Sequence, residues 1–501
     1  MSNLLALYES LAGERPDDPA LIYQREPHVG VVRTWAQLRE RSEALHRRLA
    51  AAGVPEESLC AVVLADHPDL LPLLMAIWRL RGVALLVDRE WGAGLRDSIL
   101  GHSQPDAFVA IDPELTVSRM ARPEPDPALR RQLAGGAFLS YTSGSTGDPK
   151  AVVMTHGRLA TTMYAAAAAV VRLRGSAPSR IACSMRLSGS GVLNLHYTWA
   201  LCAEAAVVVL PQLDLTTARD YWRDVERNEV EQMFLVPPLI DLLNHVAAPP
   251  GGTRPPPICI TGSSPLSPRT QERFQRRFGI GLLNAFGLTE TMCACFFGEY
   301  DEQGMGRNSI GQPALLKARL RDRDGNVVHG AGEGELELSG PTLFGGYFGN
   351  PAATEAAFRG SWFRTGDLLR RDERGRYWTV GRLKDVVMKG SFAIYLNEIE
   401  EAAIGVDGVL EAAAVPLRLP DGSEDFGLLV RFHPDGAVPR DAMAVAAELR
   451  HRLGPQRTPR RVIEITEPLP RTGQEKLNRA RTRALWHELS GHAALDLANP
   501  S

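Results

Sequence analysis

Residues 141–150 read Tyr-Thr-Ser-Gly-Ser-Thr-Gly-Asp-Pro-Lys, and the rest of the fold can be worked out from this segment. It follows a short run at 137–141 that predicts a strand, and it precedes a helix expected to begin near Thr155. Glycine and hydroxyl residues at a strand end let backbone N–H groups converge on a phosphate, and Lys150 adds a positive charge. A Walker A loop is excluded, because a proline precedes the lysine and an alanine follows it. The segment predicts a phosphate-binding loop, with a flexible Ser/Gly turn as the alternative.

On both sides of this segment, short β-branched runs alternate with helical patterns, up to about residue 310. Alternation over this length implies right-handed crossovers and parallel sheets with helices on both faces. Strands are expected at residues 60–65, 83–88, 107–112, 137–141, 180–184, 206–210, 232–236 and 257–260. Helices are expected at residues 67–81, 91–101, 155–174, 191–203, 216–228 and 267–278.

The pattern changes after residue 310. Strands expected at 318–322, 334–339, 368–372 and 376–380 are separated by Asp-Gly and Arg-Gly turns, which favours a small antiparallel barrel. A compact α+β piece begins near Lys384, with helices expected at 396–403 and 441–453 and strands at 410–416, 428–433 and 462–466. The predicted fold class is α/β: a large N-terminal unit of parallel sheets with flanking helices plus a small β-barrel, then a small mobile α+β domain. We place the core at residues 1–382 and the mobile domain at 383–501.

The composition is that of an ordinary globular protein, with 501 residues, 44% of them hydrophobic and 23% charged. A net charge of −3 argues against non-specific electrostatic binding to nucleic acid. The apolar runs are too short to cross a bilayer, and the N-terminus lacks the pattern of a signal peptide. Six cysteines form no CxxC pair and no disulfide framework. These observations predict a reduced, cytoplasmic protein with no nucleic-acid partner and no membrane span.

Lysine is rare in this chain. Only five of the 56 basic residues are lysine, namely Lys150, Lys317, Lys384, Lys389 and Lys476. Arginine is a wide fork that always carries its charge, whereas lysine is a compact point charge on a flexible stem. A lysine kept against this bias is therefore expected to be needed as lysine.

Six motifs occur in order along the chain and together resemble the adenylate-forming enzymes. This superfamily contains acyl- and aryl-CoA synthetases, peptide-synthetase adenylation domains and luciferases. The first motif is the segment 141–150. The others are 284–290 (N-A-F-G-L-T-E), 334–347 (G-E-L to G-Y), 362–368 (W-F-R-T-G-D-L), 381–400 (beginning G-R-L-K-D) and 470–479 (P-R-T-G-Q-E-K-L-N-R). Each motif alone is a weak signal, but their order and spacing make the set specific.

The resemblance implies an enzyme that uses ATP and Mg²⁺. A carboxylate attacks the α-phosphate of ATP and gives acyl-AMP and pyrophosphate, and the acyl group then passes to a thiol. Negative charge builds up on the phosphoryl oxygens, so positioned cations and a metal ion do most of the catalysis. By the same resemblance, the catalytic residues are Lys476, Thr289, Lys150 and Arg382.

The resemblance also assigns binding roles. The residues assigned to binding the phosphates of ATP are Thr142, Ser143, Gly144, Ser145, Thr146, Gly147 and Lys150. Thr289 contacts the α-phosphate, Glu290 binds Mg²⁺ and Phe286 stacks on adenine. The remaining nucleotide-binding positions are Gly262, Ser263, Ser264, Asn284 and Gly287. Asp367 accepts from the ribose hydroxyls, Arg382 contacts ribose and phosphate, and Lys476 reaches the forming acyl-phosphate oxygen. Lys384 matches the hinge about which the C-terminal domain swings.

The sequence departs from the family pattern at the wall of the acyl pocket. Ser188, Gly189 and Gly191 stand where the family has an aromatic-His pair, or an Asp that binds an α-ammonium group. An unpaired buried ammonium is costly, so we expect an aryl or acyl acid without a recognised α-amino group. Arg186 either pairs with an anionic group of the substrate or has a structural role.

The acceptor of the acyl group is the most open part of the interpretation. In the expected pantetheine tunnel, Ser391 follows Gly390 where the family has a second glycine, which narrows the passage. A thiol is the first choice, from either CoA or a carrier-protein phosphopantetheine. The Arg-rich segment 451–483 could dock an acidic carrier protein or the CoA 3′-phosphate, or form a solvated helix face. The alternatives are an amide-forming ligase that uses an amine, and a non-catalytic member that binds nucleotide or acyl-AMP.

Overall fold

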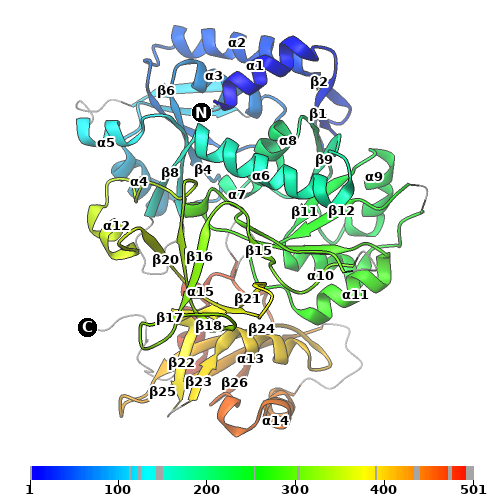
Figure 1. Cartoon of the computed structure of the whole chain (residues 1–501), viewed down its shortest axis with the longest axis vertical. Helices are drawn as coiled ribbons and strands as arrows, with labels where there is room; N and C mark the ends of the chain where they lie inside the picture. The colour runs from blue at the N-terminus through cyan, green and yellow to red at the C-terminus, as the bar shows by residue number, and fades with distance from the viewer. Residues whose placement is uncertain are drawn as a thin grey trace. The chain divides into compact units, whose positions relative to one another are not determined.

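The structure is a computed structural model that describes residues 3–111, 114–120, 126–142, 150–252, 254–301, 305–389, 392–433, 441–471 and 477–491. The chain divides into two compact units (Figure 1). Unit 1 comprises residues 1–318 and 338–363, and unit 2 comprises residues 319–337 and 364–501. This division follows packing, whereas the boundary expected at residue 382 is a functional one and stays a prediction. Among the described residues, no helix is long and apolar enough to cross a membrane.

Unit 1 contains a nine-stranded sheet whose six central strands are parallel, as the strand–helix alternation predicts. Its order is β15-β14-β13-β12-β11-β9-β10-β1-β2, and the pairs at both edges are antiparallel. The strands are β1 Pro19–Tyr23, β2 Val31–Thr34, β9 Arg180–Cys183, β10 Ala206–Val209, β11 Gln232–Leu235, β12 Ile258–Thr261, β13 Leu282–Phe286, β14 Phe296–Phe297 and β15 Gln312–Pro313.

A six-stranded sheet in the same unit has the order β6-β5-β3-β4-β7-β8, with four parallel strands at its centre. The strands are β3 Leu59–Val63, β4 Val83–Val87, β5 Ala107–Ile111, β6 Leu115–Arg119, β7 Gly136–Thr142 and β8 Lys150–Thr155. Sequence analysis did not expect β8, in which valines favour a strand directly after the predicted phosphate loop. Helix α6 (His156–Arg174) then begins at Thr155, whose Oγ1 accepts from the backbone N–H of Arg158 (3.3 Å).

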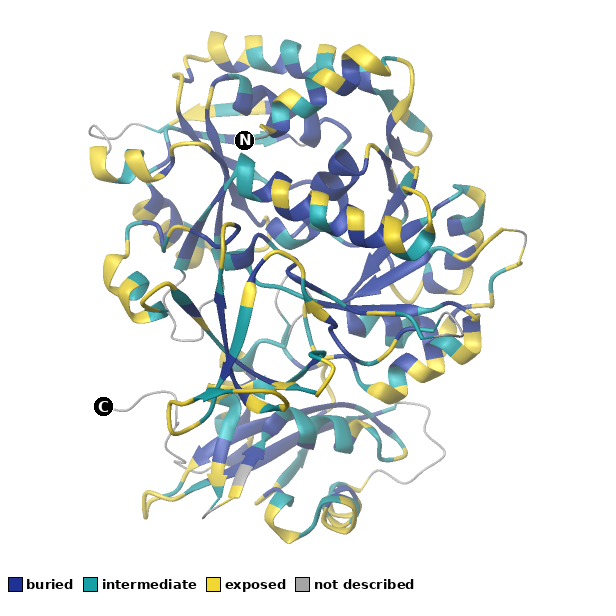
Figure 2. Cartoon of the chain, in the orientation of Figure 1, coloured by how far each residue is buried: buried dark blue, intermediate teal, exposed yellow. Residues whose placement is uncertain are grey.

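Some helices of unit 1, among them α2 (Trp35–Ala51), bury one face and expose the other (Figure 2), whereas α3 (Leu70–Arg79) is buried along nearly its whole length. In α2, the buried side chains include Leu38, Leu45 and Leu49, at the spacing of one helix face. The helix expected at 191–203 is broken into α7 (Ser190–Val192), a π-helix (Leu193–Thr198) and α8 (Trp199–Cys202). The other helices are α1 Leu4–Glu14, α2 Trp35–Ala51, α3 Leu70–Arg79, α4 Ala93–Ser103, α5 Pro127–Gln132, α9 Tyr221–Arg227, α10 Pro237–Val246, α11 Pro268–Phe278 and α12 Pro351–Ala357.

The expected small barrel is a curled half-barrel sheet with the order β17-β16-β18-β20-β19, in which β21 also pairs with β20. Its strands are β16 Lys317–Arg321, β17 Val327–Val328, β18 Gly332–Ser339, β19 Phe358–Arg359, β20 Trp362–Arg371 and β21 Tyr377–Arg382. The pairs β16–β17, β19–β20 and β20–β21 are antiparallel, as the Asp-Gly and Arg-Gly turns predict.

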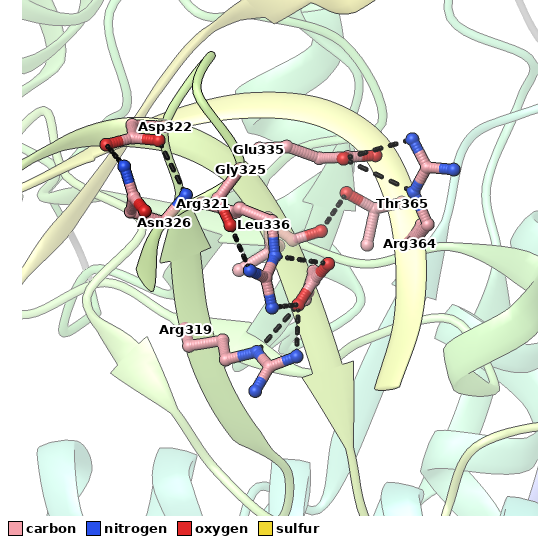
Figure 3. A network of polar contacts seen from close by, with 10 residues as sticks. Arg319, Arg321, Asp322, Gly325, Asn326, Glu335, Leu336, Arg364 and Thr365 are labelled. Carbon is pink, nitrogen blue, oxygen red and sulfur yellow. Dashed lines mark hydrogen bonds and ion pairs between the residues drawn. The ribbon is translucent and has the colours of Figure 1, made fainter. Parts of the chain in front are cut away.

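A buried ionic network joins the middle strands of this sheet (Figure 3). The fully buried Glu337 of β18 accepts from Nε of Arg319 (2.6 Å) and Nε of Arg321 (3.0 Å), both on β16. Glu335, two residues earlier on β18, accepts from Arg364 of β20, the neighbouring strand on the side away from β16 (3.4 Å). The strands of unit 2 that precede the C-terminal elements are therefore linked by charges as well as by backbone hydrogen bonds.

The C-terminal part of unit 2 is the α+β piece that the sequence predicts. A hairpin of β22 (Val386–Lys389) and β23 (Phe392–Tyr395) precedes a sheet of β24 (Val409–Arg418), β25 (Glu424–Phe432) and β26 (Val462–Glu464). The helices are α13 Leu396–Ile404, α14 Ala442–Leu453 and α15 Arg479–Ser490. Trp486 of α15 packs on Gly427, where a Cβ would lie 2.0 Å from the indole ring. A glycine is therefore required at this point of β25.

Candidate active site

The predicted phosphate loop is bounded by two paired strands of the six-stranded sheet. β7 and β8 are antiparallel, and their register places Thr142 opposite Lys150. Of Thr142 only the backbone is described. Outside the described residues lie Ser143, Gly144, Ser145, Thr146 and Gly147. Their predicted role in holding the β- and γ-phosphates stays a prediction, while Lys150 stands at the described end of the loop.

Lys150, which begins β8, and Glu290, in the turn after β13, contact the same aromatic side chain. Tyr347 donates its hydroxyl to Oε1 of Glu290 (2.8 Å). Nζ of Lys150 lies 4.9 Å from the centroid of the Tyr347 ring, within the range of a cation–π contact. The structure therefore brings together a residue predicted for the phosphates and the residue predicted for the metal. Sequence analysis gave Tyr347 no role, although it ends one of the six motifs.

The residues predicted for adenine and the α-phosphate follow two neighbouring parallel strands. β12 and β13 pair with Thr261 opposite Asn284, so both strands leave the sheet at the same edge. In parallel α/β sheets, ligands bind at the carboxyl ends of the strands. The segments that leave this edge carry Gly262, Ser263, Ser264, Phe286, Gly287, Thr289 and Glu290.

Two glycines allow these strand ends to approach each other. A Cβ on Gly262 would lie 2.4 Å from the carbonyl oxygen of Ala285, and one on Gly287 would lie 1.4 Å from that of Cys293. Both neighbours are backbone atoms, so the contacts cannot be relieved by side-chain rotation. Directly after Gly287, residues Thr289–Thr291 form a 3₁₀ turn that carries Thr289 and Glu290 half-buried. The glycines thus fix where the predicted α-phosphate and metal residues lie.

The predicted wall of the acyl pocket follows β9 and extends into α7. It contains Ser188, Gly189 and Gly191, and the Oγ of Ser188 is buried without a hydrogen-bond partner among the described residues. Arg186 pairs with both oxygens of the buried Asp88 (3.0 and 3.4 Å) and with Glu90 (3.0 Å). Two carboxylates therefore face one guanidinium. This arrangement favours the structural role of Arg186 over pairing with an anionic substrate group.

In unit 2, the predicted ribose residues stand next to each other. Asp367 on β20 is opposite Arg382 on β21, and Oδ1 of Asp367 lies 2.8 Å from Nε of Arg382. Asp367 is buried, whereas the Arg382 side chain is 47% exposed. The backbone N–H of Asp367 donates to Oγ1 of Thr365 (3.0 Å), and this bond fixes the backbone of the residue that carries the carboxylate. The pair can therefore present one acceptor and one cation side by side.

The remaining predicted positions belong to the C-terminal part of unit 2. Lys384 lies in the 3₁₀ turn Leu383–Asp385. Burial lowers the pKa of Lys384, and nearby arginines add to this effect while Asp385 opposes it. Outside the described residues lie Gly390, Ser391 and Lys476. The hinge, tunnel and catalytic-lysine roles of these residues stay predictions.

Two arginines within the predicted catalytic-lysine motif, to which sequence analysis gave no individual role, lie on either side of residues 472–476. Arg471 donates to Oε1 of Glu411 (2.7 Å), and Nη2 of Arg479 donates to Oε2 of Glu400 (3.0 Å). The chain on either side of residues 472–476 is thus anchored to β24 and α13. Nothing local in the sequence identifies these partners, because they lie 60 and 79 residues away along the chain.

A magnesium ion fits the donor chemistry around Glu290. The described residues contain no group of three or more His, Cys, Asp or Glu side chains that could share a metal ion. Mg²⁺ is usually bound by one or two carboxylates together with substrate phosphates and water. Glu290 supplies one such carboxylate, and the hydroxyl of Tyr347 engages only its Oε1. The site therefore suits an ion that arrives with a nucleotide.

Comparison with known proteins agrees with this geometry. The sequence model of the AMP-binding enzyme family matches residues 8–348. The sulfoacetate–CoA ligase of Cupriavidus necator is 31% identical, with 95% of this chain and 97% of the relative covered. A feruloyl-CoA synthase from an Amycolatopsis species is 27% identical, with 91% of this chain and 94% of the relative covered.

Solved structures show the same fold. ATP-bound MatB from Rhodopseudomonas palustris has a TM-score of 0.79 at 22% identity and covers 97% of this chain and 100% of its own. The amide bond synthetase McbA from Marinactinospora thermotolerans has a TM-score of 0.75 at 20% identity, with coverages of 96% and 100%. The resemblance and the α/β fold class predicted from the sequence are thereby confirmed. The family match spans more than half of the residues, and the chain therefore belongs to the AMP-binding enzyme family, as an AMP-forming acid–thiol ligase.

Proposed function

We propose that this ligase acts on an aryl or alkyl carboxylic acid without an α-amino group, and that CoA is its acceptor. Ligases of this class consume ATP with Mg²⁺ and release pyrophosphate as they form acyl-AMP. The observation that supports the proposal most strongly is the contact of Lys150 and Glu290 with Tyr347. A cation for the phosphates and a carboxylate for the metal have to lie together around a single triphosphate.

In the first half-reaction, a carboxylate oxygen of the substrate attacks the α-phosphorus of ATP. The bond from this phosphorus to the bridging oxygen breaks, and pyrophosphate leaves. Lys150 and the N–H groups of the preceding loop take up charge on the β- and γ-phosphates. Thr289 donates to the α-phosphate, and Lys476 meets the oxygen at which the acyl group joins it. Glu290 would hold Mg²⁺, which would neutralise further phosphate charge.

The nucleoside is held by groups from both strands and turns. Phe286 offers an aromatic face to adenine, and the turn with Gly262, Ser263 and Ser264 provides backbone groups at the same sheet edge. Asp367 accepts from the ribose hydroxyls while Arg382 contacts ribose and phosphate. The buried carboxylate and the half-exposed guanidinium suit these two tasks.

In the second half-reaction, the sulfur of CoA attacks the acyl carbon. The bond from this carbon to the phosphate oxygen breaks, AMP leaves, and the thiol proton passes to solvent. We assign this step to a second position of the mobile domain, residues 383–501, reached by rotation about Lys384. Gly390 and Ser391 line the entry of the pantetheine arm.

The wall of the acyl pocket supports a substrate that is uncharged away from its carboxylate. Ser188, Gly189 and Gly191 provide no carboxylate for an ammonium group. Arg186 is engaged by Asp88 and Glu90, so its charge is already compensated. Relatives named for feruloyl-CoA and for indoleacetate, at 27% and 28% identity, support an acid of this kind, whereas the relative named for sulfoacetate, at 31% identity, is named for an acid with a second anionic group.

The other acceptors are weaker candidates. An amine acceptor is compatible with the fold, since McbA, an amide bond synthetase, has the same fold. A carrier protein has no support among the named relatives, which are CoA ligases. A non-catalytic member is disfavoured because Lys150, Glu290, Asp367, Arg382 and Lys476 are all present. A cytoplasmic location, with its supply of ATP and CoA, completes the proposal.

Acid-dependent exchange of labelled pyrophosphate into ATP tests the first half-reaction directly. A panel of neutral aryl and alkyl acids is compared with amino acids and dicarboxylates, without thiol or amine. Exchange confined to the neutral acids supports the proposal, and exchange with amino acids alone would overturn the substrate class. CoA and hydroxylamine are then added separately. An acyl-CoA product supports the thiol acceptor, and hydroxamate formation without any CoA product would favour the amide-forming alternative.

A further inference from the structure

Tyr347 links the two groups of unit 1 that are assigned to the phosphates and the metal. Its hydroxyl donates to Oε1 of Glu290 at 2.8 Å, and its ring lies 4.9 Å from Nζ of Lys150. The tyrosine is only 7% exposed. One buried side chain therefore contacts both groups, by its polar end and by its face.

The backbone around Tyr347 is tied to the same two segments. Tyr347 forms an isolated antiparallel bridge with Val152 of β8, two residues after Lys150. The backbone N–H of Phe344 donates to the carbonyl oxygen of Glu290 (2.9 Å). The tyrosine cannot shift without disturbing β8 or the turn that carries Glu290. Its hydroxyl is thus a fixed point for the carboxylate.

The chemistry of the phenol suits a permanent donor. A tyrosine hydroxyl carries one O–H that can donate a hydrogen bond, and here it donates to Glu290 (2.8 Å). A hydrogen bond to one oxygen of a carboxylate restricts the rotation of the group and leaves its other oxygen for a metal. The negative face of the ring attracts the ammonium group of Lys150.

We propose that Tyr347 is a positioning residue that holds Glu290 ready for Mg²⁺ and keeps Lys150 beside it before ATP binds. This inference rests on the proposed role of Glu290 as the metal carboxylate. Removing a group that orients a metal ligand typically weakens metal binding about 10- to 100-fold. A similar loss is expected here, because the hydroxyl acts on Glu290 alone.

The test measures ATP binding by calorimetry, once with Mg²⁺ and once with EDTA, in the absence of any acid. The ratio of the two dissociation constants reports the gain that Mg²⁺ provides. Tyr347→Phe removes the hydroxyl and keeps the ring, while Tyr347→Leu removes both. Tyr8→Phe, which removes a buried hydroxyl from α1 beside Trp35, is the matched control.

We expect Tyr347→Phe to reduce the Mg²⁺-dependent gain about 10-fold and to leave ATP binding in EDTA within twofold. Tyr347→Leu should weaken binding in EDTA as well, since Lys150 loses the ring. Tyr8→Phe should change neither constant. Glu290→Gln is measured in parallel to separate the two proposals. If Tyr347→Phe keeps the Mg²⁺-dependent gain in ATP affinity while Glu290→Gln loses it, the positioning role of Tyr347 alone is overturned. An unchanged gain in both variants overturns the metal role of Glu290 and the positioning role with it.

Discussion

Gly287 is the position in the candidate site where an added methyl group meets the strongest resistance. A Cβ there would lie 1.4 Å from the carbonyl oxygen of Cys293 and 2.8 Å from the Cα of Ala294. Ordinary contacts begin at 3.4 Å, so Gly287→Ala requires a backbone displacement of about 2 Å. Both neighbours belong to the main chain, and no side-chain rotation can supply that displacement.

The displacement acts on the residues proposed for the chemistry, because the turn that carries Thr289 and Glu290 begins two residues after Gly287. A misplacement of about 1 Å can lower a rate by about 10²-fold. We therefore expect Gly287→Ala to lower acid-dependent ATP–pyrophosphate exchange at least ~10²-fold. Overpacking of the turn should also cost about 1–3 kcal/mol of unfolding free energy. Exchange with the preferred acid and calorimetric unfolding measure the two effects.

Gly101→Ala is the matched control for this substitution. Gly101 lies in α4, and a Cβ there meets nothing within 4 Å. Its exchange rate should stay at the wild-type value, and its stability should rise by roughly 0.5–1 kcal/mol, because alanine is the better helix former. A folded Gly287→Ala variant that exchanges within twofold of wild type would refute the reasoning. It would mean that the turn can move without moving the groups that are proposed to hold the α-phosphate and the metal.

Three further predictions concern unit 2. Lys476→Ala should lower exchange by about 10²- to 10³-fold, because a positioned cation is lost. It should leave the unfolding temperature unchanged, and wild-type exchange would remove Lys476 from the first half-reaction. Ser391→Gly should raise kcat/KM for CoA about 3-fold, or ~0.6 kcal/mol, without changing exchange; an unaltered value would show that the serine does not narrow the tunnel. Burial acts to raise the pKa of Glu337, but hydrogen bonds from Arg321 and Arg319 outweigh burial and lower it. The stabilisation from Glu337 is therefore present above the ordinary carboxyl pKa and is lost as the pH falls through the depressed folded value. Glu337→Gln should lower the free energy of unfolding by about 3–5 kcal/mol near neutral pH. It should also reduce the loss of stability at acidic pH, measured by urea unfolding, and an unchanged loss would contradict this.

Local signals explain which parts of the fold could be predicted. The N-terminal caps at Thr155, Ser267 and Asp441 each accept from the first turn of the helix that follows, and sequence analysis expected helices from those points. β1 and β2 were not expected, because β1 joins its sheet by pairing Leu21 with Val207, far along the chain. The same limit applies to the broken helix after Gly189, where a π-helix depends on packing rather than propensity.

The residues of the candidate site could likewise be predicted where the signal is local, and not where it depends on distant partners. Motif positions such as Glu290 and Asp367 could be named, because their chemistry and spacing are local. Their contacts could not, because the hydrogen bond from Tyr347 to Glu290 joins residues far apart in the sequence, and the ion pair of Asp367 with Arg382 depends on the register of two strands. Arg186 is the most instructive case, because no acidic residue stands near it in the sequence, whereas the carboxylates that pair with it follow β4 of the other sheet. A charge beside a predicted pocket therefore says little about the substrate until its own partner is known.

The scarcity of lysine was only a partial guide to functional residues. Lys150 contacts an aromatic face, where a compact ammonium group fits. Lys389, to which sequence analysis gave no role, donates to Asp425 (2.8 Å) and to the carbonyl oxygen of Thr458 (3.0 Å). A point charge with rotating donors can satisfy a carboxylate and a carbonyl that are not coplanar, whereas a planar guanidinium is suited to a flat pair. Lys317 is exposed on β16, where an arginine would serve equally well. The bias against lysine thus points to positions that need a compact cation, and such a need can arise from packing as well as from catalysis.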